Sequence, residues 1–138
     1  MLDSYHNRHP GQLAAELDAA RRVGFMPVEV PGPAFDALAA GGAAMIYVVV
    51  GDRLLVSQRR LMDEHITHAV LAGGEPVHAA GEVKIGSRRD TVVVAALNNA
   101  SGHYQPEAES LAVAREAFES RGVPVRPDGV RHYDWRRS

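Results

Sequence analysis

The chain has 138 residues, a formal net charge of −2 at pH 7 and no cysteine. This length suits one domain over residues 1–138, whose hydrophobic core needs no disulfide or metal to hold it. The absence of cysteine excludes a disulfide framework, a thiolate zinc site and a cysteine nucleophile. Apolar residues make up 46% of the chain and charged residues 23%, which is ordinary for a globular protein.

The N-terminus lacks a basic segment followed by an apolar one, which is the pattern of a signal peptide. No apolar run approaches the length of a membrane span, so we expect no membrane contact. We therefore expect a cytoplasmic protein as produced, whose export would need another route or a larger parent chain.

Arginine supplies nearly all of the positive charge, because Lys84 is the one lysine among 15 basic residues. Five of the arginines lie toward the C-terminal end of the chain: Arg121, Arg126, Arg131, Arg136 and Arg137. Two interpretations stay open, the codon usage of a GC-rich genome and a patch of arginines that contacts phosphate.

The first third of the chain predicts short helices separated by glycine and proline. Apolar spacing predicts a helix over residues 11–23, which Gly24 ends. A short extended segment over residues 25–30 follows. Residues 34–40 predict one or two helical turns, closed by Gly41-Gly42.

Two β-hairpins are predicted in the middle of the chain. Residues 44–50 and 53–58 flank Gly51-Asp52, which suits a two-residue hairpin turn. Residues 59–74 are expected to be irregular or briefly helical.

The second hairpin begins with residues 77–85, where apolar and polar side chains alternate. Residues 86–90 turn the chain into residues 91–97. The unbroken apolar run of this last segment predicts a central strand that is covered on both faces.

A helix is predicted after the second hairpin, and Gly122 ends it. The residues that suit its first turn are Pro106, Glu107 and Glu109. Its inward stripe consists of Leu111, Ala114 and Phe118. Residues 123–125 add a short edge strand. The whole pattern predicts an α+β fold: a mostly antiparallel sheet of four or five strands, an N-terminal helix, and a helix after the central hairpin, with the helices on one face.

Polar and ionisable residues gather where the apolar run 91–97 stops. If Ile85 pairs with Thr91 across the second hairpin, Asn98 lies opposite His78 and Glu82 lies deeper in the sheet. The same pairing gathers six residues at one rim of the sheet: His68, His78, Asn98, Ser101, His103 and Tyr104. Glu82 would then lie about 13 Å from His78 along the strand.

Three segments carry a family resemblance: residues 67–77, Ala79-Ala80-Gly81-Glu82-Val83, and Ser101-Gly102-His103-Tyr104-Gln105-Pro106. Over about residues 45–122 the chain resembles a module of the C-terminal domains of bacterial polymorphic toxins, and it is similar to the plant IQM group of calmodulin-binding proteins. The resemblance implies an effector-like domain, with an immunity protein as a partner to look for, and names no reaction. The family pattern tends to read His-Ser-Ser where this chain has His68-Ala69-Val70, so a role for those hydroxyls does not carry over.

The leading hypothesis is acid/base chemistry without a metal or cofactor, applied to the phosphodiester bonds of RNA or a nucleotide. Glu82 would take the proton of the ribose 2′-hydroxyl, and His103 would protonate the leaving oxygen. His68 or Arg88 would stabilise the charged phosphate.

Two other functions stay open. In ADP-ribosyl transfer or NAD cleavage, NAD is the substrate, Glu82 stabilises the ribosyl cation, and His68 and Tyr104 hold the nicotinamide half. In a non-catalytic ligand- or protein-binding module, the Gly73-Gly74 loop and the Ser101–Tyr104 turn form a recognition rim.

The remaining candidates for substrate binding are Gly73, Gly74, Asn98, Ser101 and Tyr104. Each has a structural alternative: a histidine or serine can brace a turn, a tyrosine can belong to the core, and a glycine pair can form a plain loop. His65 and His68 admit a metal site, with Glu64 and His78 nearby. Because no His-Glu-x-x-His pattern is present, we expect no metal.

Overall fold

The computed structural model describes residues 2–42 and 44–135. The strands are β1 (Val28–Glu29), β2 (Met45–Val50), β3 (Arg53–Gln58), β4 (Arg60–Leu61), β5 (Glu64–His65), β6 (Ala79–Arg88), β7 (Thr91–Asn98) and β8 (Val130–Arg131). The helices are α1 (Leu13–Arg22), α2 (Pro33–Gly41), α3 (His68–Leu71) and α4 (Ser110–Glu119), with short 3₁₀ segments at Pro10–Gln12 and Pro127–Gly129.

The main sheet has six strands in the order β1-β3-β2-β6-β7-β8, and β4 and β5 form a separate small hairpin. Its pairings are antiparallel except that of β7 with β8, which is parallel. The α+β class is therefore confirmed, and the sheet is larger than the expected four or five strands. The additional strands, β1 and β8, are two-residue edges; β1 lies within the extended segment expected over residues 25–30, and β8 is too short for periodicity to reveal.

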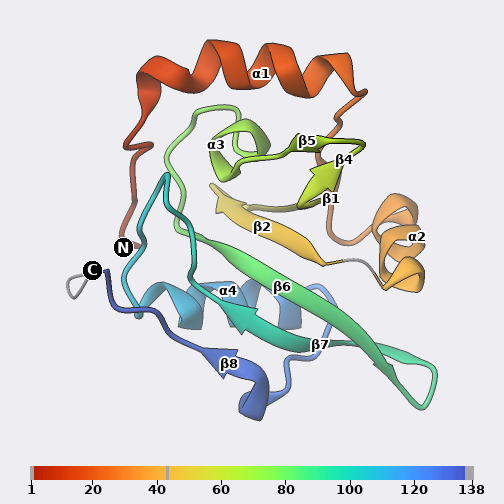
Figure 1. Ribbon diagram of the computed structural model, residues 1–138. Coiled ribbons are helices and arrows are strands. Elements are labelled where there is room, and N and C mark those ends of the chain that lie inside the picture. Colours follow the sequence, from red (N-terminus) through yellow and green to blue (C-terminus); the bar gives the residue numbers. More distant parts are fainter. Residues whose placement is uncertain (1, 43, 136–138) are drawn as a thin grey trace.

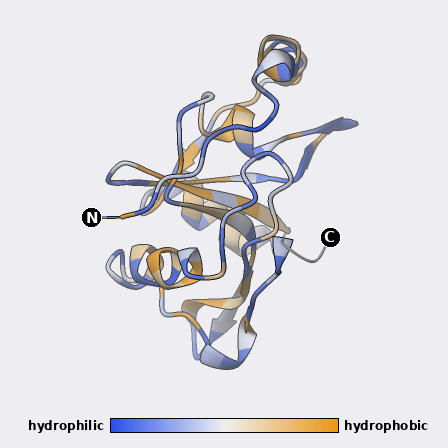
Figure 2. Ribbon diagram, turned by 90° about the vertical axis from the view of Figure 1, so that its left-hand side faces the viewer, coloured by the Kyte–Doolittle hydropathy of each residue, from blue (hydrophilic) through white to orange (hydrophobic). Residues whose placement is uncertain are grey.

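Helices cover both faces of the sheet, which corrects the expectation of one covered face. Helix α4 packs on β6, β2 and β7, whereas α3 packs on β2 and β3 and supports α1. Figure 1 shows α1 above α3, and the side view in Figure 2 places α4 on the side of the sheet opposite to α1.

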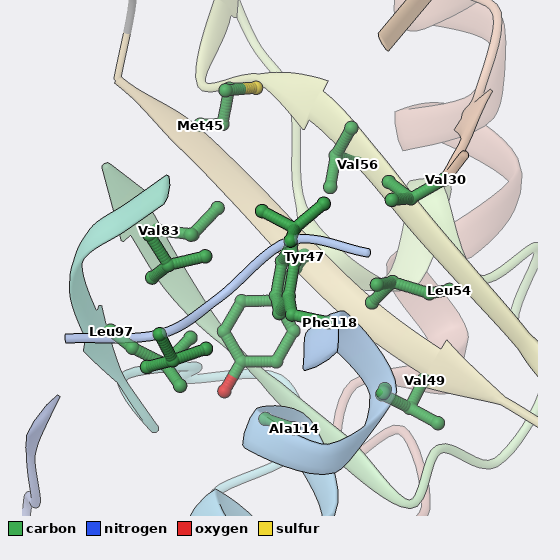
Figure 3. Packing of buried hydrophobic residues seen from close by; sticks show 14 of the residues in the cluster. Val30, Met45, Tyr47, Val49, Leu54, Val56, Val83, Leu97, Ala114 and Phe118 are labelled. Atoms are coloured by element: carbon green, nitrogen blue, oxygen red, sulfur yellow. The ribbon is translucent and has the colours of Figure 1, made fainter. Parts of the chain in front are cut away.

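Strand β2 is the central strand that both layers bury, and not residues 91–97 as expected. Its side chains alternate between two apolar clusters, because successive residues of a strand point to opposite faces. Tyr47 belongs to the cluster under α4 and contacts Phe118 edge-on, with ring centroids 5.9 Å apart (Figure 3). Ile46 belongs to the cluster under α3. In β7, by contrast, Ala96 is exposed.

The register of the β6–β7 hairpin differs from the expected one by three residues. Thr91 pairs with Arg88 and not with Ile85. The turn is only Arg89-Asp90, and both residues adopt positive φ angles of 52° and 67°. Such angles are those of a tight hairpin turn whose twist matches that of the strands. A register shift between Lys84 and Ile85 then brings the end of β7 beside Glu82.

The helix after this hairpin begins later than expected, at Ser110 and not near Pro106. The carbonyl of Pro106 accepts a hydrogen bond of 2.9 Å from the Asn99 side chain. The N–H of Ser110 donates to Glu107 O at 3.0 Å. These bonds replace the first helical bonds. The inward stripe is confirmed, since Leu111, Ala114 and Phe118 are all buried.

The ends of the expected helices agree well with the sequence, whereas residues 59–74, expected to be irregular or briefly helical, form the β4–β5 hairpin as well as the short helix α3. Gly24, Gly42 and Gly122 have positive φ angles where α1, α2 and α4 end. Residues 123–125 contribute a single parallel bridge between Val125 and Val94 and no regular strand.

Candidate functional site

Glu82, Asn98 and Arg131 lie in one row across the open end of the sheet. Glu82 on β6 pairs with Ile46 on β2, and Asn98 on β7 pairs with Arg131 on β8. Glu82 and Asn98 are joined by two hydrogen bonds. The corrected register thus removes the gap of about 13 Å that the sequence predicted between Glu82 and the rim.

The Asn98 side chain fixes the position of Glu82. Its Oδ1 accepts hydrogen bonds from the N–H groups of Glu82 at 2.8 Å and Ala100 at 2.9 Å, and its Nδ2 donates to Glu82 Oε1 at 3.0 Å. Its main-chain carbonyl accepts a bond of 2.7 Å from the hydroxyl of the buried Tyr47. The carboxylate is therefore anchored through Asn98 to the core. Asn98, which was expected to bind substrate, orients Glu82.

The second oxygen of the Glu82 carboxylate lies 3.2 Å from Arg59 Nη2. The Glu82 side chain is 34% exposed, so it remains accessible to solvent. An ionised carboxylate offers about four acceptor positions. Asn98 and Arg59 occupy two of them, and the group keeps the capacity to accept a proton or a further hydrogen bond.

Glu82 lines a cavity of about 210 Å³. A larger open cavity of about 640 Å³ adjoins it, since Ala44 and Arg59 belong to both walls. We call the two cavities together the Glu82 groove. Its charged or hydrogen-bonding wall residues are Gln58, Arg59, Arg60, His65, Glu82, Lys84, Asn98 and Arg131.

The charge of the Glu82 groove is opposite in sign to that of the whole chain. Among the described wall residues, the cations Arg59, Arg60, Lys84 and Arg131 face the single carboxylate of Glu82. The chain as a whole carries −2. A concentration of one sign of charge in a hollow attracts the opposite sign, so this groove favours a polyanion.

The glycine of the Ala80-Gly81-Glu82 segment is required by close backbone packing. A side chain at Gly81 would overlap the carbonyl oxygen of Asn98 and crowd the backbone of Asn99. Only glycine lets the end of β7 approach β6 this closely. That approach is what brings the Asn98 amide to the Glu82 carboxylate.

His68 supports the same segment from beneath and carries no charge at neutral pH. Its Nε2 lies 2.8 Å from the carbonyl oxygen of Gly81, and a carbonyl only accepts, so Nε2 holds the hydrogen. Burial lowers the pKa of His68 to about 4, against a smaller opposing effect of the Gly81 hydrogen bond. A neutral, buried ring does not fit the expected role of steadying a phosphate.

His103 is paired with a residue that the sequence analysis missed. Its Nε2 lies 2.8 Å from Glu16 Oε2 on α1, its ring contacts His9 edge-on, and its carbonyl accepts from Arg8 N–H at 2.7 Å. The two paired side chains are 18% and 19% exposed. His103 is not among the described residues of the Glu82 groove, so the expected shared hollow of Glu82 and His103 is not formed.

The Ser101–Tyr104 turn does meet the loop at residues 72–76, as expected, through packing. The buried Tyr104 hydroxyl donates to Glu75 O at 2.8 Å, and burial raises the pKa of Tyr104 to about 12. Ser101 is buried as well. Gly73 and Gly74 have φ angles of 63° and 80°, so both glycines have a conformational reason to be there.

A side chain at Gly74 would overlap that of Leu13, so this loop lies against α1. His78 does not join the rim, because its Nδ1 donates to Asp3 O at 2.9 Å near the N-terminus.

Arg88 lies at the exposed tip of the β6–β7 hairpin, six residues from Glu82 on the same strand. At the usual rise this separation is about 20 Å, so Arg88 is not near the groove. Arg131 is the member of the C-terminal arginine group that lines it. Arg136 and Arg137 lie outside the described residues.

The groove residues that were not predicted from the sequence are Arg59, Arg60 and Lys84, whereas Arg131 belongs to the C-terminal arginine group for which phosphate contact stayed open. Arg59 and Arg60 form a charged pair directly after a predicted strand, and this pattern in the sequence could have indicated them. Lys84 follows Glu82 at a spacing of two on an alternating strand, so both were expected on one face. Nothing local indicates that Arg131 pairs beside Asn98.

Within residues 2–42 and 44–135, no group of three or more histidine or acidic side chains is arranged to hold a metal ion. A helix of sufficient length and apolarity to span a membrane is likewise absent from this part of the chain. Comparisons with family models, curated proteins and solved structures find no match.

Proposed function

We propose that this chain is a small effector-like domain that cleaves phosphodiester bonds of RNA by acid/base catalysis, with Glu82 as the general base. One observation carries the proposal: an oriented, solvent-accessible carboxylate lies in a groove whose other charged wall residues are cations. Cations attract the phosphate backbone, and the carboxylate supplies the base that the 2′-hydroxyl requires. The resemblance to polymorphic-toxin modules is consistent with such an effector, and an immunity protein remains a partner to test.

In the proposed reaction, the Glu82 carboxylate takes the proton of the ribose 2′-hydroxyl. The 2′-oxygen then forms a bond to phosphorus as the bond to the 5′-oxygen breaks, and the leaving oxygen receives a proton. The products are a 2′,3′-cyclic phosphate and a 5′-hydroxyl. Lys84 and Arg131 would stabilise the charge that develops on the phosphate oxygens.

Arg59 and Asn98 hold the Glu82 carboxylate in a defined orientation. Preorganisation of this kind contributes to catalysis because the base needs no rearrangement in the transition state. Neither residue has to move a proton. The step uses no metal ion and no cofactor.

The geometry supports NAD cleavage or ADP-ribosyl transfer less well. Both side chains expected to hold the nicotinamide half, His68 and Tyr104, are buried and bonded to main-chain carbonyls. A binding module without catalysis would use the same groove, and the experiment below separates it from an enzyme.

The test is incubation of the protein with a fluorescent single-stranded RNA and with its all-2′-O-methyl analogue, each with and without EDTA. We expect cleavage of the RNA to 2′,3′-cyclic phosphate ends, no cleavage of the analogue, and no effect of EDTA. RNA binding without cleavage would replace the enzyme by a binding module. Equal cleavage of the methylated analogue would contradict Glu82 as the base for a 2′-hydroxyl.

A further inference from the structure

We infer that His65 is the general acid of the reaction, the group that protonates the leaving 5′-oxygen. The inference rests on the proposed function. From the sequence, His65 was a candidate only for metal binding. Protonation of the 5′-oxygen is required because an alkoxide is a poor leaving group, and histidine is the side chain best suited to donate a proton near neutral pH.

His65 is held at the groove by the β4–β5 hairpin. His65 pairs with Arg60 across this hairpin, and Ile66 N–H donates to Arg59 O at 2.9 Å. The backbone of Arg59 is in turn bonded to Ala44, just before β2, at 3.4 Å. Directly paired residues on neighbouring strands have side chains on the same face. Both Arg60 and His65 accordingly line the larger cavity of the groove.

Arg59 lines both the cavity of the proposed acid and the cavity of the proposed base. Its side chain reaches Glu82 in the smaller cavity, and it also lines the larger cavity beside His65. Phosphoryl transfer places the attacking and leaving oxygens on roughly opposite sides of phosphorus. A phosphate bound at Arg59, where the two cavities adjoin, would have the carboxylate in the smaller cavity and the imidazole in the larger one.

The described histidines of this region differ in their access to substrate. His65 is exposed and lines the groove. His68 is buried and bonded to Gly81 O, and His103 is largely covered and paired with Glu16. Of the three, His65 alone combines an accessible ring with a place in the Glu82 groove.

The proposed step is balanced in protons and bonds. The 2′-oxygen loses its proton to Glu82 and bonds to phosphorus, while the P–O5′ bond breaks and the 5′-oxygen takes a proton from the His65 imidazolium. The enzyme is left with a protonated Glu82 and a neutral His65, and exchange with water restores both. No oxidant or reductant takes part.

The experiment compares two substrates that differ in their leaving group: the dinucleotide UpA and uridine 3′-(4-nitrophenyl phosphate). Nitrophenolate leaves without protonation, so it does not need a general acid. We expect His65→Ala to lower the cleavage rate of UpA by about 100-fold and to change that of the nitrophenyl ester by less than about threefold. Glu82→Gln should slow both substrates, and His103→Ala should slow neither at equal folded fraction.

The outcomes distinguish the inference from the proposed function. If the wild-type chain cleaves neither substrate, the proposed function fails. If the wild-type chain cleaves both and His65→Ala slows both equally or neither, the function stands and the role of His65 is overturned. A circular dichroism melt of the variant verifies folding, and the exposed position of His65 favours an intact fold.

Discussion

Glu82 and Glu16 both have hydrogen-bonded side-chain partners, and the two residues differ in what surrounds them. Glu82 is 34% exposed, is bonded to Asn98 and Arg59, and faces a groove lined by cations. Glu16 is 19% exposed and bonded to His103. The Glu16–His103 pair has the composition of an acid/base couple, yet it joins α1 to the Ser101–Tyr104 turn and lines neither cavity of the Glu82 groove.

The difference follows from the elements that carry the two residues. Glu82 stands on a central strand and is anchored through Asn98 to Tyr47 in the core. Glu16 stands on α1, which rests on α3 with only Ala20 fully buried. The pair with His103 therefore helps to hold a weakly packed helix. A polar pair gains its function from access to substrate, and proximity of acid and imidazole alone is insufficient.

The largest expected effect is that of Glu82→Gln compared with the matched Glu16→Gln. Loss of a general base lowers a rate by about 100- to 10,000-fold, and we expect Glu82→Gln to fall in this range on RNA. Glu16→Gln should stay within about threefold of wild type when rates are normalised to folded protein, because it touches no groove residue. Equal losses in both variants would remove the distinction between the two sites.

His68 gives the next largest effect, on stability and not on rate. Its pKa of about 4 in the fold lies below the 6.5 of an exposed histidine, so the unfolded chain binds the proton more readily. The fold should therefore lose stability as the pH falls from 6.5 to 4, by about 3 kcal/mol in total from this group.

The measurement for His68 is urea unfolding at several pH values from 7 to 4. His68→Gln retains an N–H that can donate to Gly81 O but does not titrate, so its stability should fall less steeply over this range. Parallel curves for wild type and variant would contradict the buried, neutral state of His68.

His103→Ala should weaken the fold and spare catalysis. Loss of a partly buried hydrogen bond to a carboxylate is expected to lower the free energy of unfolding by about 1–2 kcal/mol. Urea unfolding measures this change, and single-turnover RNA cleavage by the folded protein should be unchanged. Lost cleavage with unchanged stability would move His103 back into the active site.

The smallest effect concerns salt dependence of RNA binding, for which Lys84→Ala is compared with Arg88→Ala. Each phosphate contact on single-stranded nucleic acid contributes about −0.7 to the slope of log K against log salt. Lys84 lines the groove, and Arg88 lies at the hairpin tip. We expect the slope to fall by about 0.7 for Lys84→Ala only, as measured by fluorescence anisotropy with catalytically inactive Glu82→Gln protein.

Local elements of this fold were predictable because their signals are short in range. The Gly51-Asp52 turn joins β2 and β3 as expected, and the stripe of Leu111, Ala114 and Phe118 is buried under the sheet. Alternation in a strand and periodicity in a helix indicate directly which side chains are buried in the core. The identity of Glu82 as a polar residue on a largely apolar strand was visible in the same way.

The register of the β6–β7 hairpin could not be predicted from the sequence, because several pairs of residues within 86–90 are suited to form the hairpin turn. Arg89-Asp90 forms the turn, and the register shift at Lys84/Ile85 completes the displacement. A hairpin whose turn moves along the chain changes every cross-strand neighbour. The displaced register is the reason that Asn98 lies beside Glu82.

The amino-acid sequence by itself determined the α+β class, the existence of the β2–β3 and β6–β7 hairpins, the main helices and the polar cluster at the end of β7. Tertiary structure alone decided that Glu82 meets Asn98 and Arg59, that His103 meets Glu16, and that helices cover both faces of the sheet. The physical reason is range: secondary structure follows from neighbours a few residues apart, whereas these contacts join residues 16 to 87 positions apart and depend on register and packing.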